Sequence, residues 1–282
     1  MDDSNQELTI RRILVALDAS THSLAALDAA AGLAASLQAE LIGLFVEDEN
    51  LVHLAGLPFS HEVRSPSAAR QPMSSDKMEQ QLLLQGSQAR RALAEAAERV
   101  QARWSFRTVR GQVTASVLTA ALEADLLAMG RISRPLSSQS RLGSTARAAS
   151  VRTKQSVLLM QQGSDLSYPV LVTYDGTPAA RQALATAARM AQASGDNLNV
   201  LLLGDSAEAV APLREEVAGW LGQRNLPAKY HWLPQATVEN LAKMIQAADD
   251  CVLVLGGENP LLEADAIQEL LDLTDCPVML VR

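Results

Sequence analysis

The chain alternates between short runs of consecutive apolar residues and longer stretches whose apolar residues are spaced as in a helix. The first run extends from Arg12 to Leu17 and ends at Asp18. A helical stretch from Ser23 to Leu37 then leads into a second run, Leu41 to Val46. Strands that are apolar on both faces are typical of parallel sheets covered by helices on both sides. The pattern therefore predicts βα units joined by right-handed crossovers.

The same pattern occurs twice. The run that ends at Asp175 matches the run that ends at Asp18, and the helix and strand that follow keep this offset of 157 residues. Later runs that end at Gly130 and Gly256 correspond at an offset of only 126. We assign the difference of 31 residues to a polar segment from Glu47 to about Gln80. A segment of this length is expected to be a functional loop or lid.

Further elements complete both halves. The other predicted helices are 78–101, 115–122, 143–152, 179–194, 209–223 and 238–247, and the other strands are 104–109, 124–130, 156–160, 169–174, 198–203, 229–233, 250–256 and 277–281. Each half is predicted to be an open, doubly wound, five-stranded parallel sheet, with domains 1–164 and 165–282. Ligands of such sheets bind at the carboxyl ends of the strands, so the turns after strands one, two and four are the candidate sites.

Composition supports a packed α/β protein without a membrane anchor. Hydrophobic residues make up 48% of the chain but aromatic residues only 3%, so Ala, Leu and Val must fill the cores. The acidic, polar start of the chain does not resemble a secretory signal. No run reaches the roughly 18 apolar residues that a membrane span requires. We therefore expect a cytoplasmic protein.

Charge is divided unequally between the halves. Residues 1–164 carry 17 Lys and Arg against 16 Asp and Glu, whereas residues 165–282 carry 7 against 16. The total of −8 argues against non-specific binding to nucleic acid, which requires a large basic surface.

Several common catalytic motifs are absent. The chain contains no P-loop, no G-x-G-x-x-G, no G-x-S-x-G and no H-E-x-x-H sequence. Its four histidines do not have the paired helical spacing of a zinc site. No catalytic residue and no metal ligand is therefore assigned.

The loop after the fourth strand of the first half suggests an anion site. It begins at Gly130 and ends in Gly143, Ser144 and Thr145, where a helix begins. A helix N-terminus offers amide donors and a positive dipole end to a phosphate. Between residues 131 and 154 there are six bases and no acid, which predicts that a polyanion is stabilised there.

The corresponding loop of the second half has the opposite character. Between residues 256 and 275 there are six acids and no base, and the loop is five residues shorter. A polyphosphate would be repelled there, so only the first half is predicted to bind one. The alternative is that both charge runs are solvated helix faces. Asp18 also has an alternative role as a helix cap, in competition with Ser20 or Thr21.

With Asp18 after strand one and Gly130-x2-Ser133-x9-Gly143-Ser144 after strand four, the chain resembles the universal stress protein family in its tandem form. The nucleotide-binding signature of that family is G-x2-G-x9-G-[ST]. The chain keeps both spacings and departs only at Ser133, where a Cβ would obstruct the approach that Gly permits. The resemblance covers residues 10 to 282 and implies a Rossmann-like fold of the adenine nucleotide alpha-hydrolase type.

The resemblance implies a set of binding residues. Asp18 would contact the ribose hydroxyls, Val46 and nearby main chain would contact adenine, and the loop after Gly130 would surround the phosphates. The ligand implied is ATP, ADP or AMP, with or without Mg²⁺. The predicted site residues are Ala16, Leu17, Asp18, Val46, Met129, Gly130, Ile132, Ser133, Gly143, Ser144 and Thr145.

The resemblance also implies an assembly. The fifth strands, 156–160 and 277–281, would pair within one chain to form an intramolecular pseudo-dimer, and a homodimer of whole chains is a further option. The only two cysteines, Cys251 and Cys276, stand at the entries of two apolar runs and are interpreted as buried free thiols. Whether they approach each other is open at this stage, because a bridge depends on geometry.

Three classes of function are compatible with these features. The leading hypothesis is a stress-response protein that binds ATP without appreciable hydrolysis and whose nucleotide biases the segment from Glu47 to Gln80, with an unidentified client protein. The second is a slow ATPase or nucleotidyl transferase, although no positioned base is evident. The third is an interaction scaffold whose acidic half binds a basic partner.

Overall fold

The computed structural model describes residues 10–57, 61–64, 69–72, 74–132, 142–195, 198–234, 237–248, 250–257 and 264–282. Elements of the first half are β1 (Arg12–Leu17), α1 (Thr21–Leu37), β2 (Glu40–Asp48), α2 (Glu49–Ala55), β3 (His61–Arg64), β4 (Ala69–Pro72), α3 (Ser75–Arg99), β5 (Trp104–Gly111), α4 (Val113–Ala121), β6 (Leu126–Gly130), α5 (Ser144–Arg152) and β7 (Ser156–Met160). Those of the second half are β8 (Val170–Tyr174), α6 (Pro178–Ser194), β9 (Leu198–Leu203), α7 (Ala207–Gly222), β10 (Ala228–Leu233), α8 (Val238–Ala247), β11 (Val252–Gly256), α9 (Ala264–Leu273) and β12 (Val278–Val281).

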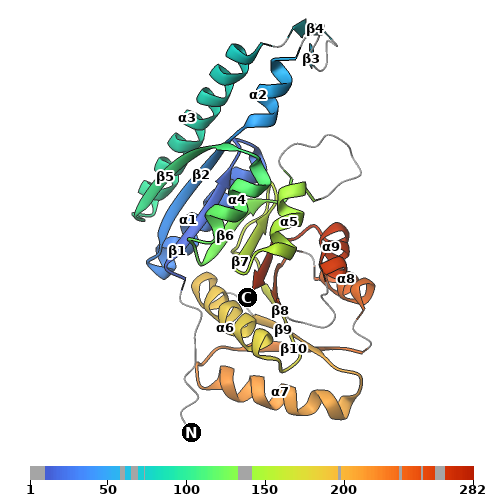
Figure 1. The fold of residues 1–282 in the computed structure, drawn as a ribbon. Coiled ribbons are helices and arrows are strands. Elements are labelled where there is room, and N and C mark those ends of the chain that lie inside the picture. The colour runs from blue at the N-terminus through green and yellow to red at the C-terminus, as the bar shows by residue number, and fades with distance from the viewer. Residues whose placement is uncertain are drawn as a thin grey trace.

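One ten-stranded sheet runs through the molecule, in the order β10-β9-β8-β11-β12-β7-β6-β1-β2-β5 (Figure 1). Each half contributes five parallel strands in the order 3-2-1-4-5, which is the predicted doubly wound arrangement. The fifth strands β7 and β12 pair antiparallel, with Leu158 opposite Met279. The predicted pairing of these two strands is therefore confirmed, and it removes an exposed edge from each half.

Helices cover both faces of the sheet, and the sheet separates two hydrophobic cores. One core contains apolar side chains of α1, α3, α6 and α7, and the other contains those of α4, α5, α8 and α9. Neighbouring strand residues alternate between them, since Ile13 and Val15 belong to the first core and Leu14 to the second. This accounts for the continuous apolar runs in the sequence, because both faces of each central strand are buried.

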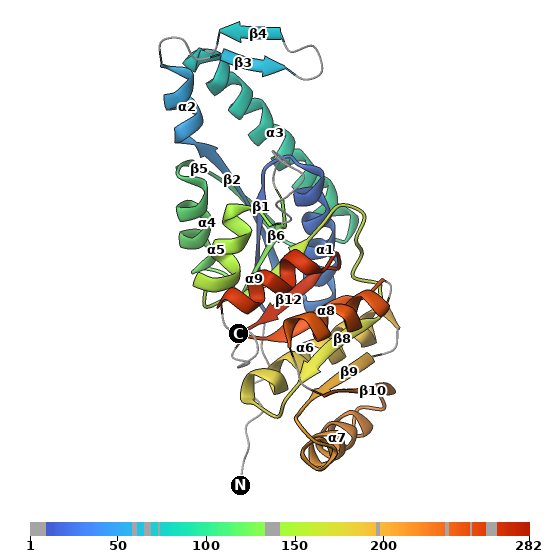
Figure 2. The ribbon, with the colours of Figure 1, turned by 90° about the vertical axis from the view of Figure 1, so that its right-hand side faces the viewer.

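The polar segment after β2 is not a simple loop. It contains α2 and the antiparallel hairpin β3–β4, and α3 begins at Ser75 rather than at the predicted Met78. Asp48 caps α2 by accepting from the Asn50 amide, and Ser74 caps α3 by accepting from Lys77. Figures 1 and 2 show α2, the hairpin and the start of α3 extending beyond the sheet. We call this unit the arm.

In the part of the chain that the structure describes, no helix is both long enough and apolar enough to cross a bilayer.

Candidate functional site

A cavity of about 80 Å³ lies at the carboxyl ends of β1, β2 and β6. A space of this size holds a few water molecules rather than a whole nucleotide. Residues 133–141, which belong to the predicted phosphate loop and include Ser133, lie outside the described residues. The cavity brings together seven of the predicted site residues: Ala16, Leu17, Asp18, Val46, Met129, Gly130 and Thr145.

Three other predicted residues do not line this cavity. Ile132 is half-buried just after β6, and Ser144 is exposed at the start of α5. The Gly143 amide donates to the Arg131 carbonyl at 2.7 Å, which brings the two ends of the loop together. The Gly143 amide is therefore already bonded within the chain. The amides that remain for an anion belong to the residues after it.

Two helix N-termini at this site lack a side-chain cap. Gln112 and Gly143 occupy the N-cap positions of α4 and α5, and neither provides a side-chain hydrogen bond to the first turn. Every other helix with a described N-cap is capped by a Ser, Thr or Asp side chain. Because the first turn of a helix carries amides with no intrahelical partner, α4 and α5 present donors and positive dipole ends here.

A hydrogen bond holds these two N-termini together. The hydroxyls of Thr114 on α4 and Thr145 on α5 are 2.9 Å apart, and Val113 and Thr145 both line the cavity. In the second half the helix that corresponds to α4 is α8, and its N-terminus is capped by Thr237, which accepts from the Asn240 amide. The two halves therefore differ in the donors that they leave available.

Asp18 has a structural role in the turn after β1. Its Oδ1 accepts from the Ser20 amide at 3.0 Å, and Ser20 in turn caps α1 by accepting from the Ser23 amide at 3.1 Å. Of the two competing caps, Ser20 is therefore the one observed. Asp18 stabilises the turn, in which Ala19 adopts a φ of +60°.

Asp175 repeats this arrangement in the second half. Its Oδ1 accepts from the amide and the hydroxyl of Thr177, which caps α6. Gly176 takes the left-handed conformation of Ala19, with a φ of +82°. The structural role of this Asp is thus common to both halves, and any role in binding ribose is additional in Asp18.

Gly130 is required by packing. A Cβ on it would lie 2.8 Å from the Cβ and 2.9 Å from the carbonyl carbon of His22, at the start of α1. Gly256 is in the same position relative to α6, where a Cβ would lie 2.8 Å from the Ala179 backbone. Since glycine is needed in both halves, Gly130 by itself does not indicate a phosphate.

This packing predicts the effect of Gly256→Ala. The new methyl group meets backbone atoms that cannot rotate away, so we expect the free energy of unfolding to fall by about 1–3 kcal/mol. Gly32→Ala is the control, because a Cβ there meets nothing within 4 Å and Ala stabilises a helix interior by roughly 0.5–1 kcal/mol. The midpoint of urea unfolding should fall in Gly256→Ala and rise in Gly32→Ala. Equal midpoints for the two variants would contradict the clash.

The basic residues near α5 do not converge on the cavity. Arg131 is buried, and its guanidinium donates to the backbone carbonyls of Leu271 and Cys276 in the second half. Arg147 donates to Gln268 at 2.6 Å and pairs with Asp272 at 3.4 Å. The prediction that these two cations stabilise a polyanion is therefore wrong.

One ion pair joins the two oppositely charged segments. Arg147 on α5 pairs with Asp272 on α9 where these helices pack together. Arg152 and Lys154 follow at the far end of α5, away from its N-terminus. Arg134 and Arg141, the other two bases of the run, lie outside the described residues.

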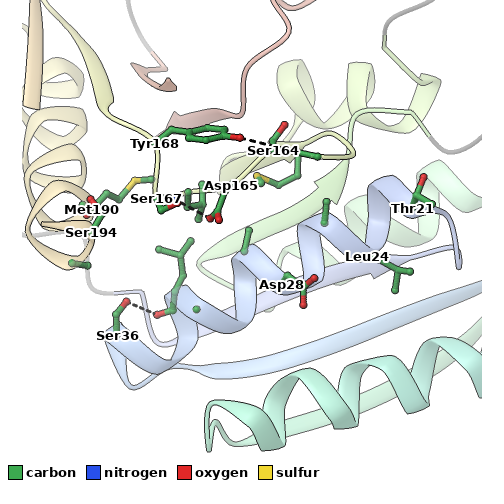
Figure 3. A pocket seen from close by; sticks show the side chains of 18 residues that line it. Thr21, Leu24, Asp28, Ser36, Ser164, Asp165, Ser167, Tyr168, Met190 and Ser194 are labelled. Atoms are coloured by element: carbon green, nitrogen blue, oxygen red, sulfur yellow. Dashed lines mark hydrogen bonds between the residues drawn. The ribbon is translucent and has the colours of Figure 1, made fainter. Parts of the chain in front are cut away.

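A larger cavity, of about 780 Å³, lies between α1 and α6 beneath residues 163–168 (Figure 3). None of the predicted site residues lines it. Its charged lining residues are Asp28 and Asp165, and no Lys, Arg or His side chain contributes to it. A polyphosphate would be disfavoured there, so volume alone does not identify the nucleotide site.

The contribution of α4 to the small cavity was not predicted from the sequence. Val113 and Val117 line the small cavity, together with Ser23 and Leu44. We considered only the turns after strands one, two and four. Because β5 is parallel to β2, the helix that follows it also begins at the carboxyl edge of the sheet. The general rule for doubly wound sheets could therefore have indicated the start of α4.

Comparison with known structures gives the same fold over nearly the whole chain. A universal stress protein from Archaeoglobus fulgidus DSM 4304 is 15% identical with a TM-score of 0.71, covering 98% of this chain and 99% of that one. A functionally unknown protein from Pseudomonas aeruginosa PAO1 is 16% identical with a TM-score of 0.61, covering 99% and 94%. A putative universal stress protein from Pseudomonas aeruginosa UCBPP-PA14 is also 16% identical, with a TM-score of 0.59 and coverage of 98% and 95%.

Sequence comparison assigns the family. No curated protein sequence matches the chain. The model of the universal stress protein family matches residues 9–161, which is more than half of the chain. The chain therefore belongs to the universal stress protein family.

Proposed function

We propose that the chain is a regulatory protein that binds one adenine nucleotide at the carboxyl edge of its first half. In this proposal residues 1–164 form the binding domain and residues 165–282 a second domain, the two making an intramolecular pseudo-dimer. The observation that carries the proposal is the pair of uncapped N-termini of α4 and α5 beside Asp18. Such termini favour anions, and α8 of the second half is capped.

Each part of an adenine nucleotide has a suitable counterpart at this site. A carboxylate has two oxygens, so Asp18 can hold its turn through Oδ1 and accept from a ribose hydroxyl through Oδ2. Apolar side chains such as Val46, Leu44 and Val117 suit a flat base. The amides that follow Gly143, with the Thr145 hydroxyl, suit the phosphates. ATP, ADP and AMP share these features, with Mg²⁺ accompanying the longer phosphate chains.

A chain of contacts supports a regulatory role for the arm. Val46 lines the cavity, and the adjoining Glu47 is buried and accepts from Arg110 Nε at 3.0 Å. Arg110 also donates to Glu79 on α3 at 3.1 Å. A nucleotide that orders the end of β2 would therefore stabilise the base of the arm, where a client protein would detect the bound state.

Matched Asp variants test the site. We expect calorimetric titration with ATP and Mg²⁺ to give one site per chain, and Asp18→Ala to weaken binding about tenfold through loss of a charge-assisted hydrogen bond. Asp175→Ala removes the same turn interaction from the second half. Both variants should lower the free energy of unfolding by a similar amount, about 0.5–1.5 kcal/mol. Asp175→Ala, however, should leave the affinity for ATP unchanged.

The Asp18→Ala and Asp175→Ala variants also define the results that would contradict the proposal. If neither variant alters a measurable ATP affinity, or if Asp175→Ala alone lowers it, the site is not in the first half. A stoichiometry of two per chain would also contradict a single functional half.

A further inference from the structure

The two cysteines of the chain are neighbours at the start of β11 and β12. These strands are parallel with Leu253 opposite Val278, and continuing this register by two residues sets Cys251 opposite Cys276. The two thiols are close enough that each has the largest influence on the pKa of the other. Adjacent strands lie about 4.8 Å apart. A disulfide requires roughly 4.4–6.8 Å between Cα atoms, so the backbone is already at a suitable separation.

The two thiols are buried, but a cavity connects them to the protein surface. Both cysteines are free and buried, yet both line a cavity of about 300 Å³. Exposed residues also line this cavity, among them Gln162, Asp250 and Asp275, so it reaches the surface. A molecule as small as a hydroperoxide has room to enter. Nothing in the proposed nucleotide site involves this region.

The two sulfurs are not equivalent. Interaction with the Cys251 thiol lowers the pKa of Cys276, and the nearby Arg131 guanidinium lowers it further, against the effect of burial. Interaction with Cys276, burial and the charge of Asp250 raise the pKa of Cys251. Cys276 is therefore the thiol that loses its proton more readily, and the thiolate is the reactive form.

We propose that Cys251 and Cys276 form an oxidation site that reacts with hydroperoxides to give an intramolecular disulfide. The Cys276 thiolate attacks the terminal oxygen of the hydroperoxide, the O–O bond breaks, and the leaving hydroxide or alkoxide takes up a proton. Cys276 is then a sulfenic acid. Cys251 attacks the Cys276 sulfur, the S–S bond forms, and the hydroxyl leaves as water with the Cys251 proton. Two thiols are oxidised and one hydroperoxide is reduced.

The disulfide would affect the contact between the halves. It closes the segment that contains β11 and α9, and α9 packs against α5 of the first half. Arg131 also donates to the Cys276 carbonyl at 3.2 Å, so the oxidised residue is held by a side chain of the other half. Closing this loop restricts the unfolded chain, so the oxidised protein should melt at a higher temperature than the reduced one.

The test uses the full chain, which has no other thiol. After treatment with hydrogen peroxide, alkylation in denaturant should count no free thiols, and dithiothreitol should restore both. Peptide mass mapping should find a Cys251–Cys276 crosslink about 2 Da lighter than the two free peptides. Counting thiols avoids interference from oxidised methionines.

Single variants test the order of the steps. Cys251→Ala should leave a Cys276 sulfenic acid that dimedone traps, whereas Cys276→Ala should leave a Cys251 thiol at least about tenfold less reactive than Cys276. Two alkylatable thiols after peroxide treatment of the wild type would overturn the proposal. A crosslink formed only between chains, or trapping at Cys251 in place of Cys276, would also overturn it.

Discussion

Replacing Gly143 with Asp is expected to lower the affinity for ATP about 100-fold or more. Gly143 is the N-cap of α5, with φ −68° and ψ 156°, a conformation that Asp adopts without strain. A carboxylate there would accept from the first-turn amides and put negative charge where the phosphates would lie. Asp is a favoured N-cap residue, so the helix should be at least as stable as in the wild type. The loss of affinity would therefore not arise from unfolding.

Gly143→Asn is the matched control for this prediction. Asn caps a helix about as well as Asp and adds nearly the same volume, but it carries no charge. We expect Asn to lower ATP affinity clearly less than Asp, and the difference to shrink at high salt. Calorimetric titration, with thermal unfolding to confirm folding, measures both. Equal affinity of the wild type and Gly143→Asp would rule out phosphate binding at α5.

Arg131→Met is expected to give the largest loss of stability, about 2–4 kcal/mol. The Arg131 side chain is 1% exposed and donates to the carbonyls of Leu271 and Cys276, near the C-terminal end of α9. Met has a similar length but no donor, so two buried carbonyls would lose a charged partner. The positive charge is also favourable at a helix C-terminus. Urea unfolding measures the change.

Arg147→Gln provides the comparison. Its ion pair with Asp272 joins the same two halves, but both side chains are about 40% exposed. Such a pair contributes roughly 0.2–1 kcal/mol, so the midpoint should hardly move. If Arg131→Met were no more destabilising than Arg147→Gln, the buried arginine would not hold the halves together.

A second arginine makes the reciprocal contact. Arg282, after β12, donates to the carbonyls of Ser150 and Thr153 at the end of α5. Each half thus supplies a cation to the C-terminal end of a helix in the other. Arg131 follows β6, the fourth strand of its half, whereas Arg282 follows β12, the fifth strand of its half. Because the two arginines are not at equivalent positions of the repeat, their reciprocal contacts could not be predicted from the sequence.

The strands and most helices were predictable because their signals are local. Buried parallel strands require continuous apolar runs, and α8 begins and ends where its apolar spacing indicates, Val238–Ala247. The arm was harder to predict. Its prolines and serines are typical of loops, whereas α2 depends on the cap at Asp48 and on packing against α3. Packing of this kind has no short-range signal.

The candidate site was predictable only in part, for a similar reason. Asp18 and Gly130 were found because they follow strands, but their hydrogen bonds and packing recur at Asp175 and Gly256. The bases of α5 suggested a polyanion, yet Arg131 and Arg147 contact residues more than a hundred positions away. A sequence shows which charges are present, whereas the fold decides which partners they meet.

The central claim is that an adenine nucleotide binds in the first half and not in the second. Crystals of the full chain grown with ATP and Mg²⁺ test it most directly. We predict nucleotide density beside Asp18, with phosphates at the N-terminus of α5, and no density at the corresponding edge of the second half. Nucleotide bound only in the second half, or in the cavity between α1 and α6, would contradict the claim.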